Sequence, residues 1–169
     1  MHRDPLLALL SRYRPTPEEA PMHRQMVAFV KQHPDCFERT LEVGHITASA
    51  WLLNKAGDAA LLMHHAKLNI WVQPGGHCDG DPDVLQVALR EAREESGIQG
   101  IEPLSPEIFD LDIHPVPGHL HYDVRFLLQV TSDETFVQNS ESNALRWVRD
   151  DLPTQERSVV RMHEKCFNR

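Results

Sequence analysis

Cysteine and long apolar runs are scarce in this chain of 169 residues. Its three cysteines, Cys36, Cys78 and Cys166, are scattered and form no Cys-x-x-Cys pair. This pattern indicates neither a disulfide framework nor a cysteine-based zinc knuckle, and it fits a reducing compartment. The longest N-terminal apolar run, at residues 6–10, is too short for a signal-peptide core or a membrane span. We therefore expect a cytoplasmic protein with no membrane partner.

Basic residues are also few. The chain has 17 Lys and Arg residues against 25 Asp and Glu residues, which gives a formal net charge of −8. Nucleic-acid backbones are bound mainly through Lys and Arg, so general nucleic-acid binding is not expected. The apolar share of 41% and the charged share of 25% are typical of a globular chain that buries a core. We expect one domain over residues 1–169.

A glycine turn, a helix and a glycine stop occupy residues 75–98. Asp81 as a cap and Pro82 in the first turn predict that the helix begins near residue 82. Gly97 predicts a left-handed end to the helix after Ser96. The expected buried side of this helix carries Leu85, Ala88, Leu89 and Ala92.

Three carboxylates, those of Glu91, Glu94 and Glu95, share one side of the last turns of this helix. Like charges at this spacing repel one another and favour a compensating cation, either an arginine or a divalent metal ion. Oxygen donors favour Mg²⁺, which commonly shares its coordination with substrate phosphates. The alternative is a solvated helix face on which Arg90 and Arg93 form ordinary ion pairs.

The flanking residues favour the metal hypothesis, because the stretch resembles the signature of the Nudix hydrolases, G-x5-E-x7-R-E-U-x-E-E-x-G-U with U an aliphatic residue. The matching positions hold Gly76, Arg90, Glu91, Ala92, Glu94, Glu95, Gly97 and Ile98. One position departs from the pattern, since Pro82 stands where the family has its first Glu. In the family that Glu supports the loop and is not the principal metal ligand.

The resemblance implies a Mg²⁺- or Mn²⁺-dependent hydrolase that cleaves the pyrophosphate linkage of a nucleoside diphosphate linked to another moiety. Glu91, Glu94, Glu95 and the Gly76 carbonyl would then bind the metal, and Arg90 would orient the carboxylates. The partner would be a small phosphorylated substrate, a nucleotide derivative. The alternative is a non-catalytic nucleotide-binding module of the same fold. Substrate identity, the number of ions and a homodimeric state stay open.

A further acid, Glu141, lies in a polar loop at residues 139–143. In many Nudix enzymes a Glu from this region reaches the metal site or acts as the general base, so the resemblance implies that role for Glu141. Glu134 is a weaker alternative, and a loop Glu of either kind is often only solvated.

Several other polar residues are candidates for substrate contact. His121, Asp123 and Arg125 alternate along one strand and so face one side, where they would contact substrate or form a surface ladder. Lys67 would bind a phosphate, and His77 follows the glycine turn and would line the pocket. The eleven histidines include no His-x-x-x-His helix pair and no Cys partner, so zinc is not expected.

The remaining pattern predicts an α/β fold, and the resemblance adds a mixed β-sheet sandwiched between helices. Two amphipathic helices, one capped by Asp4 and one opened by a capping box from Thr16 to Glu19, form an N-terminal addition over residues 1–34. This addition would pack on the sheet, cover the active site or form a dimer surface. Strands are expected at residues 44–54, 59–66, 69–73, 109–113, 120–130 and 144–149, with hairpin turns at residues 55–58 and 115–118. A C-terminal helix should open at Thr154, and its Val159, His163, Cys166 and Phe167 share a face.

Overall fold

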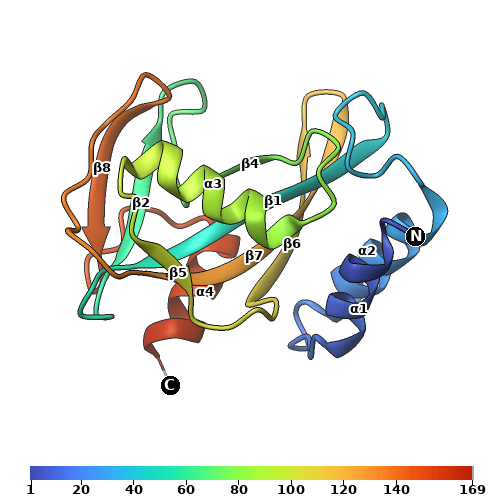
Figure 1. The fold of residues 1–169 in the computed structure, drawn as a ribbon, viewed down its shortest axis with the longest axis horizontal. Coiled ribbons are helices and arrows are strands. Elements are labelled where there is room, and N and C mark those ends of the chain that lie inside the picture. Colours follow the sequence, from blue (N-terminus) through green and yellow to red (C-terminus); the bar gives the residue numbers. More distant parts are fainter. Residues whose placement is uncertain (169) are drawn as a thin grey trace. The chain divides into compact units, whose positions relative to one another are not determined.

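The computed structural model describes residues 1–168 and contains four helices and eight strands in that range (Figure 1). Along the chain these are α1 (Asp4–Arg12), α2 (Ala20–Gln32), β1 (Gly44–Leu53), β2 (Ala60–His65), β3 (Trp71–Val72), β4 (Gly75–His77), α3 (Val84–Ser96), β5 (Ile101–Pro103), β6 (Asp110–Val116), β7 (His119–Val130), β8 (Ser142–Val148) and α4 (Arg157–Phe167). The predicted α/β class is confirmed. None of the helices in this range is long and apolar enough to cross a membrane.

Two compact units are distinguished along the chain. The first comprises residues 1–49, 75–88 and 105–126, and the second comprises residues 50–74, 89–104 and the chain from residue 127 onward. The strands β1 and β7 and the helix α3 each contribute residues to both units. The single domain expected from the sequence stays a prediction, and the two units are described separately.

The first unit contains two antiparallel strand pairs. In one pair β4 lies beside β1, with Gly76 opposite Ala48. In the other, β6 and β7 form the predicted hairpin, which closes where Val116 lies opposite His119. A Cβ atom on Gly75 would overlap the side chain of Ser49, so glycine at this position is required by the close approach of β4 to β1.

Contacts between β1 and β7 advance in the same direction along both strands. The Leu120 N–H donates to the Val43 carbonyl at 3.3 Å, and further along both strands the Ser49 hydroxyl donates to Asp123 at 2.7 Å. The two strands therefore run parallel, whereas β4–β1 and β6–β7 are antiparallel. This combination gives the mixed sheet that the family resemblance implies.

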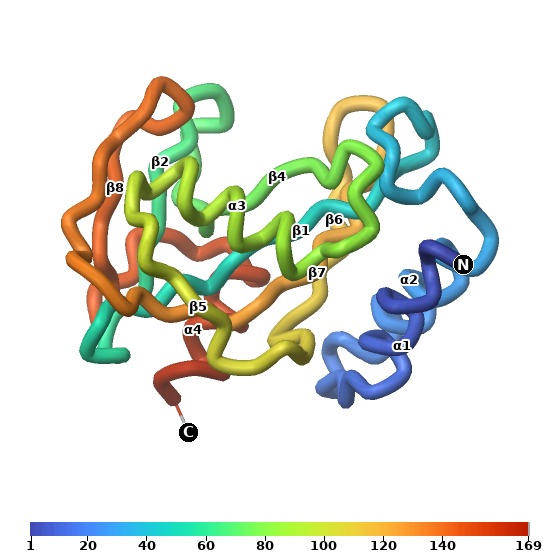
Figure 2. The backbone as a smooth tube through the Cα atoms, in the orientation of Figure 1, coloured from blue at the N-terminus to red at the C-terminus, as the bar shows by residue number. Residues whose placement is uncertain are grey.

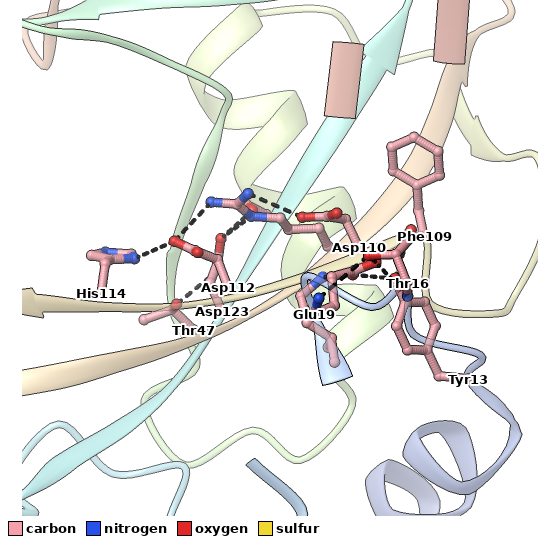
Figure 3. Close-up of polar contacts among 12 residues, drawn as sticks. Tyr13, Thr16, Glu19, Thr47, Phe109, Asp110, Asp112, His114 and Asp123 are labelled. Atoms are coloured by element: carbon pink, nitrogen blue, oxygen red, sulfur yellow. Dashed lines mark hydrogen bonds and ion pairs between the residues drawn. The ribbon is translucent and has the colours of Figure 1, made fainter. Parts of the chain in front are cut away.

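The N-terminal helices α1 and α2 lie side by side in the first unit (Figure 2). The Phe29 ring of α2 stacks on Tyr122 of β7, with 3.9 Å between ring centroids. The Tyr13 hydroxyl, just after α1, donates to the carbonyl of Phe109 beside β6 at 3.3 Å (Figure 3). The addition thus packs on the sheet, as one of the three predictions has it, and its apolar core consists of Leu6, Leu10, Met26, Phe29 and Val30.

The capping box predicted at Thr16 and Glu19 forms, but it precedes the helix. The Glu19 N–H donates to the Thr16 hydroxyl at 3.3 Å, and the Thr16 N–H donates to the Glu19 carboxylate at 3.2 Å. The helix α2 itself begins at Ala20, with Pro21 in its first turn. A proline is favoured there because its missing N–H would have no helical partner. The cap predicted at Asp4 is wrong, since Asp4 lies inside α1 and accepts from the N-terminal amino group.

The second unit is built around β2. This strand pairs antiparallel with β8, where Leu61 lies opposite Trp147, and with β3, and it turns into the end of β1 through the predicted hairpin at residues 54–59. A three-residue strand, β5, pairs with the end of β7, with Glu102 opposite Gln129. The sequence did not predict β5, because a run this short that ends in proline carries no periodicity.

The C-terminal helix α4 begins at Arg157, three residues later than predicted. Thr154 does not cap it, and its hydroxyl instead accepts the Glu156 N–H at 3.1 Å in the preceding turn. The buried side chains of α4 are Val159, Arg161 and Met162. Of the four residues predicted to share a face, Val159 is buried, whereas His163, Cys166 and Phe167 are half-buried.

The start of α3 also differs from the prediction. Asp83 caps the helix by accepting the Gln86 N–H at 3.2 Å, whereas Asp81 accepts the Asp83 N–H at 2.9 Å in the turn before it. Pro82 therefore precedes the helix and does not occupy its first position. The predicted end is confirmed, since Gly97 has φ +75°. The buried side carries Val84, Val87, Ala88, Leu89 and Ala92, and Leu85 is only half-buried.

Candidate functional site

The three carboxylates of the helix α3 lie in the second unit, and each has a different exposure. Glu94 is exposed, Glu91 is half-buried and Glu95 is 4% exposed. Burial raises the pKa of Glu91, and the charge of Glu94 raises it further. A hydrogen bond with Glu95 and the charge of Arg90 act in the opposite direction without reversing the shift. Folding therefore disfavours the ionised form of the Glu91 carboxyl.

The loop that carries Glu141 is anchored to the same helix. The Asn139 side-chain amide donates to the carbonyl of Glu94 at 3.2 Å, and the Glu141 N–H donates to the Asn139 side chain at 2.9 Å. The carboxylate of Glu141 lies near enough to raise the pKa of Glu91 as well. Four carboxylates from two segments of the second unit thus gather around the end of α3.

The other loop candidate, Glu134, interacts with a different segment of the second unit. Its carboxylate accepts the Lys55 N–H at 2.8 Å and so holds the turn between β1 and β2. Of the two acids considered from the sequence, Glu141 is the one placed beside the carboxylates of α3.

This set of donors fits a hard divalent cation. All four side chains supply oxygen, which is the donor that Mg²⁺ and Mn²⁺ prefer. The solvated-face alternative accounts for Glu94 but not for Glu95, whose carboxylate is almost wholly removed from solvent. The guanidinium of Arg90 acts to lower the pKa of Glu91 but does not reverse the rise. A divalent cation would remove the remaining repulsion.

We expect the substitution Glu91→Gln to raise or preserve stability near neutral pH without divalent cations. A carboxyl whose pKa is raised on folding binds its proton more tightly in the folded state, so it favours folding at low pH. That contribution is lost as pH rises through the folded-state pKa, and near neutral pH the unfavourable charge remains. Saturating Mg²⁺ should raise the melting temperature of the parent chain more than that of the variant.

Thermal unfolding near neutral pH, with and without Mg²⁺, measures both effects. Glu102→Gln, which removes an exposed carboxylate of β5, is the control and should leave the Mg²⁺ response unchanged. A variant that is much less stable than the parent without metal, or equally stabilised by Mg²⁺, would contradict this assignment.

Five histidines gather in the first unit, on β1, β4, β6 and β7. The His45 ring lies with its centroid 5.1 Å from that of His77 and 4.9 Å from that of His121. Burial lowers the pKa of His121 to about 3, and burial also lowers the pKa values of His45 and His77. The remaining members are His114 and His119. The folded chain therefore favours the neutral form of the His45, His77 and His121 rings.

Sequence reasoning selected His77 and His121 but missed His45 and His119. The available signal was the i, i+2 spacing of His119 and His121, which places both on one side of a strand. Nothing in the sequence placed β1 beside β4 and β7, so the convergence of His45 with the others was not predictable.

Asp123 and Arg125 belong to a buried ion network in the first unit. The Arg125 guanidinium donates to Asp123 at 2.8 Å and to Asp110 at 3.2 Å, and it lies 3.6 Å from Asp112 (Figure 3). Burial lowers the pKa of Arg125, but the three carboxylates more than offset this and raise it. The Thr47 hydroxyl also donates to Asp123, at 2.8 Å.

The network changes how these two residues are interpreted. Arg125 is 2% exposed and Asp123 is 4% exposed, so the surface ladder considered from the sequence is wrong for both. Their polar atoms are committed to one another and to β1 and β6, which favours a structural role over substrate contact.

The structure shows where two other predicted site residues lie, but it does not test their roles. Lys67 is exposed in the turn after β2, where its N–H donates to the ring of His65 at 3.2 Å. Gly76 lies in the first unit, paired with Ala48. Phosphate binding by Lys67 and metal binding by the Gly76 carbonyl stay predictions.

Comparison with known proteins decides the family. The model of the NUDIX domain matches residues 43–161, which is more than half of the chain. The chain belongs to the Nudix family. The resemblance seen in residues 76–98 is thereby confirmed, including the departure at Pro82, which does not remove the chain from the family.

Among curated proteins, the m7GpppN-mRNA hydrolase NUDT17 of Danio rerio is 30% identical over 151 residues. The match covers 75% of this chain and 49% of that protein, so the chain spans about half the length of this curated Nudix relative.

Solved structures confirm the Nudix fold. A NUDIX-family hydrolase from Clostridium perfringens is 26% identical, with a TM-score of 0.56, and the match covers 72% of this chain and 95% of that one. A UDP-X diphosphatase structure is only 13% identical but has a TM-score of 0.58 and covers 97% of this chain and 91% of its own. The similarity to the UDP-X diphosphatase shows the fold alone, and the matched region includes the N-terminal helices.

Proposed function

We propose that this Nudix chain is a Mg²⁺- or Mn²⁺-dependent hydrolase that cleaves the pyrophosphate linkage of a nucleoside diphosphate linked to another moiety. The observation that carries the proposal is the gathering of Glu91, Glu94, Glu95 and Glu141 at the end of α3, where burial and the charges of Glu94 and Glu141 raise the pKa of Glu91. Family membership supports the reaction class. The relative from Danio rerio is named as a hydrolase of m7GpppN-mRNA, which supports a substrate derived from a nucleotide.

In this proposal Glu91, Glu94 and Glu95 hold the cation. When bound, such an ion supplies Lewis-acid stabilisation of the charge that develops on the diphosphate. Arg90 keeps the carboxylates oriented through its charge, which already lowers the pKa of Glu91. Glu141 accepts the proton of the attacking water, because its carboxylate is exposed and its loop is fastened to the carbonyl of Glu94.

The alternative is a Nudix-fold module that binds a nucleotide without cleaving it. Such modules usually lack one or more acids of the box, whereas Glu91, Glu94 and Glu95 are all present here. Equilibrium binding of a nucleotide without turnover at saturating Mg²⁺ would favour this alternative.

Glu141→Gln should lower kcat by about 10²- to 10⁴-fold, the range that a general base contributes. The reason is that glutamine preserves the shape of the side chain but cannot accept a proton. Glu134→Gln is the matched control from the same region and should retain the parent kcat. Equal losses in the two variants would remove the special role of Glu141.

The proposed reaction is tested with a panel of linked nucleoside diphosphates, dinucleoside polyphosphates and nucleoside triphosphates in the presence of Mg²⁺ or Mn²⁺. Released nucleotide and phosphate are the readouts. We expect turnover of at least one class, complete inhibition by EDTA and recovery when Mg²⁺ is restored. Turnover that persists in EDTA would contradict the metal requirement.

A further inference from the structure

Three imidazoles of the first unit face one another across three strands. The ring nitrogens of His45 on β1, His77 on β4 and His121 on β7 include one set of three atoms that all lie within 4.8 Å of one another. His45 is 2% exposed, and His77 and His121 are half-buried. Two of the three residues therefore keep part of their surface in contact with solvent.

His45 gives an independent indication of a ligand. Neither of its ring nitrogens has a hydrogen-bond partner with acceptable geometry, although both are buried. The backbone of Leu41 acts to raise the pKa of His45, but burial outweighs this effect. Buried polar atoms in folded proteins almost always have a hydrogen-bond or ligand partner. We therefore expect the ring nitrogens of His45 to bind a ligand.

We propose that His45, His77 and His121 form a metal site for a divalent transition metal of borderline softness, with Zn²⁺ first in order. Imidazole nitrogen suits Zn²⁺, Ni²⁺ and Cu²⁺, whereas the carboxylates of α3 suit Mg²⁺ and Mn²⁺, so the two sites select different ions. Three protein ligands would leave one position of a tetrahedral Zn²⁺ site open to water or another ligand. The absence of zinc expected from the sequence is thereby revised.

The spacing of the rings suits this ion. Zn²⁺ with nitrogen ligands at about 2.0–2.1 Å holds them about 3.3 Å apart in a tetrahedron, so modest rotations of the three rings bring the nitrogens into place. His119 is positioned to supply a fourth ligand, since its Nε2 atom lies 3.3 Å from that of His121.

Titratable and charged groups of neighbouring segments lie beside the three rings. His114, which is not one of the three proposed ligands, hydrogen-bonds through Nδ1 to Asp112 at 3.1 Å, and its ring centroid lies 5.4 Å from that of His121. The nearby cation Arg39 is offset by Asp79, with which it forms two contacts of 2.6 and 2.7 Å.

The opposing interpretation is a packed group of neutral rings with no ion. Zn²⁺ binding to the metal-free chain of residues 1–169 distinguishes the two interpretations. Zn²⁺ is titrated in competition with a chromophoric chelator, and Co²⁺ serves as a spectroscopic probe of the donors. We expect one tight equivalent of Zn²⁺ and Co²⁺ absorption typical of nitrogen and oxygen donors. His77→Gln and His121→Gln should each weaken binding by about 100-fold or more.

Two control variants locate the site. His64→Gln removes a histidine of the second unit, and Glu94→Gln removes a carboxylate of α3, and neither should change the Zn²⁺ affinity. Zn²⁺ should also raise the melting temperature of the parent and not that of His121→Gln, a half-buried position where circular dichroism verifies the fold.

Three results would overturn the proposal. One is Zn²⁺ binding by the parent that is no tighter than that of a surface histidine. Another is an unchanged affinity in the His121→Gln variant. The third is an affinity that is lost in Glu94→Gln while the histidine variants retain it. Since the readout is metal binding, the result is independent of whether the proposed hydrolase activity is found.

Discussion

Glu94→Gln is expected to lower kcat/KM for hydrolysis of the linked diphosphate by about 10³-fold, because it removes a negative oxygen donor from the proposed cation site. Glu94 is exposed, so the substitution should leave the melting temperature without metal close to that of the parent. Excess Mg²⁺ should recover part of the loss, since the variant still holds Glu91 and Glu95. Initial rates over a range of Mg²⁺ concentrations measure both effects.

Glu95→Gln should cause a loss of similar size, but it is a less clean test because Glu95 is 4% exposed and also hydrogen-bonds Glu91. Glu102→Gln provides the control for a change of charge in the second unit, and it should retain the parent rate. If Glu94→Gln hydrolysed the substrate as fast as the parent, the assignment of the carboxylates to the metal would be wrong.

The second large effect concerns stability. Arg125→Met should lower the free energy of unfolding by about 3–5 kcal/mol, the cost of removing one partner from a buried ion group. The substitution leaves Asp110, which is fully buried, and Asp123 without their guanidinium. Methionine preserves much of the apolar stem, so lost packing contributes little. Arg125→Lys should not recover the loss fully, because an ammonium cannot form the same fork of contacts.

Arg12→Met is the matched control in the same unit. Arg12 pairs with Glu107, but their side chains are 54% and 46% exposed, and an exposed pair contributes less than about 1 kcal/mol. Urea unfolding of the three variants and the parent gives the free energies. Equal losses for Arg12→Met and Arg125→Met would contradict the structural role assigned to the buried network.

Local signals predicted the elements well where they were strong. The hairpin of β1 and β2 followed from two β-rich runs around a glycine turn, and the end of α3 followed from Gly97. The start of α3 was less certain, because Asp81 and Asp83 flank Pro82 and both can act as caps. Which of them caps the helix depends on how the preceding turn folds, and the sequence does not reveal this.

Tertiary contacts account for the larger misses. The alternation in β7 correctly placed Asp123 and Arg125 on one side of the strand, but periodicity does not tell whether the second side is exposed. Here Tyr122, Val124 and Phe126 are buried on one side, and the ion network is buried on the other. A strand buried on both sides carries charged residues only where partners such as Asp110 neutralise them.

The residues of the candidate site also differ in whether local sequence signals could predict them. The carboxylates of α3 were found from their helical spacing and the family resemblance, and Glu141 came from the resemblance alone. Its position became understandable only through Asn139, which ties the loop to Glu94 across 45 residues of sequence. His45 was missed for the same physical reason, since its neighbours come from strands that are distant along the chain.

Binding of Mn²⁺ to the metal-free chain tests the central claim most directly, because free Mn²⁺ has a strong electron paramagnetic resonance signal that is lost on binding. The claim is that the carboxylates at the end of α3 hold a hard divalent cation. We predict that the parent removes Mn²⁺ from solution and that a Glu91→Gln, Glu94→Gln double variant of unchanged fold does so far less. A parent that leaves the signal unchanged, or a double variant that depletes it equally, would contradict the claim.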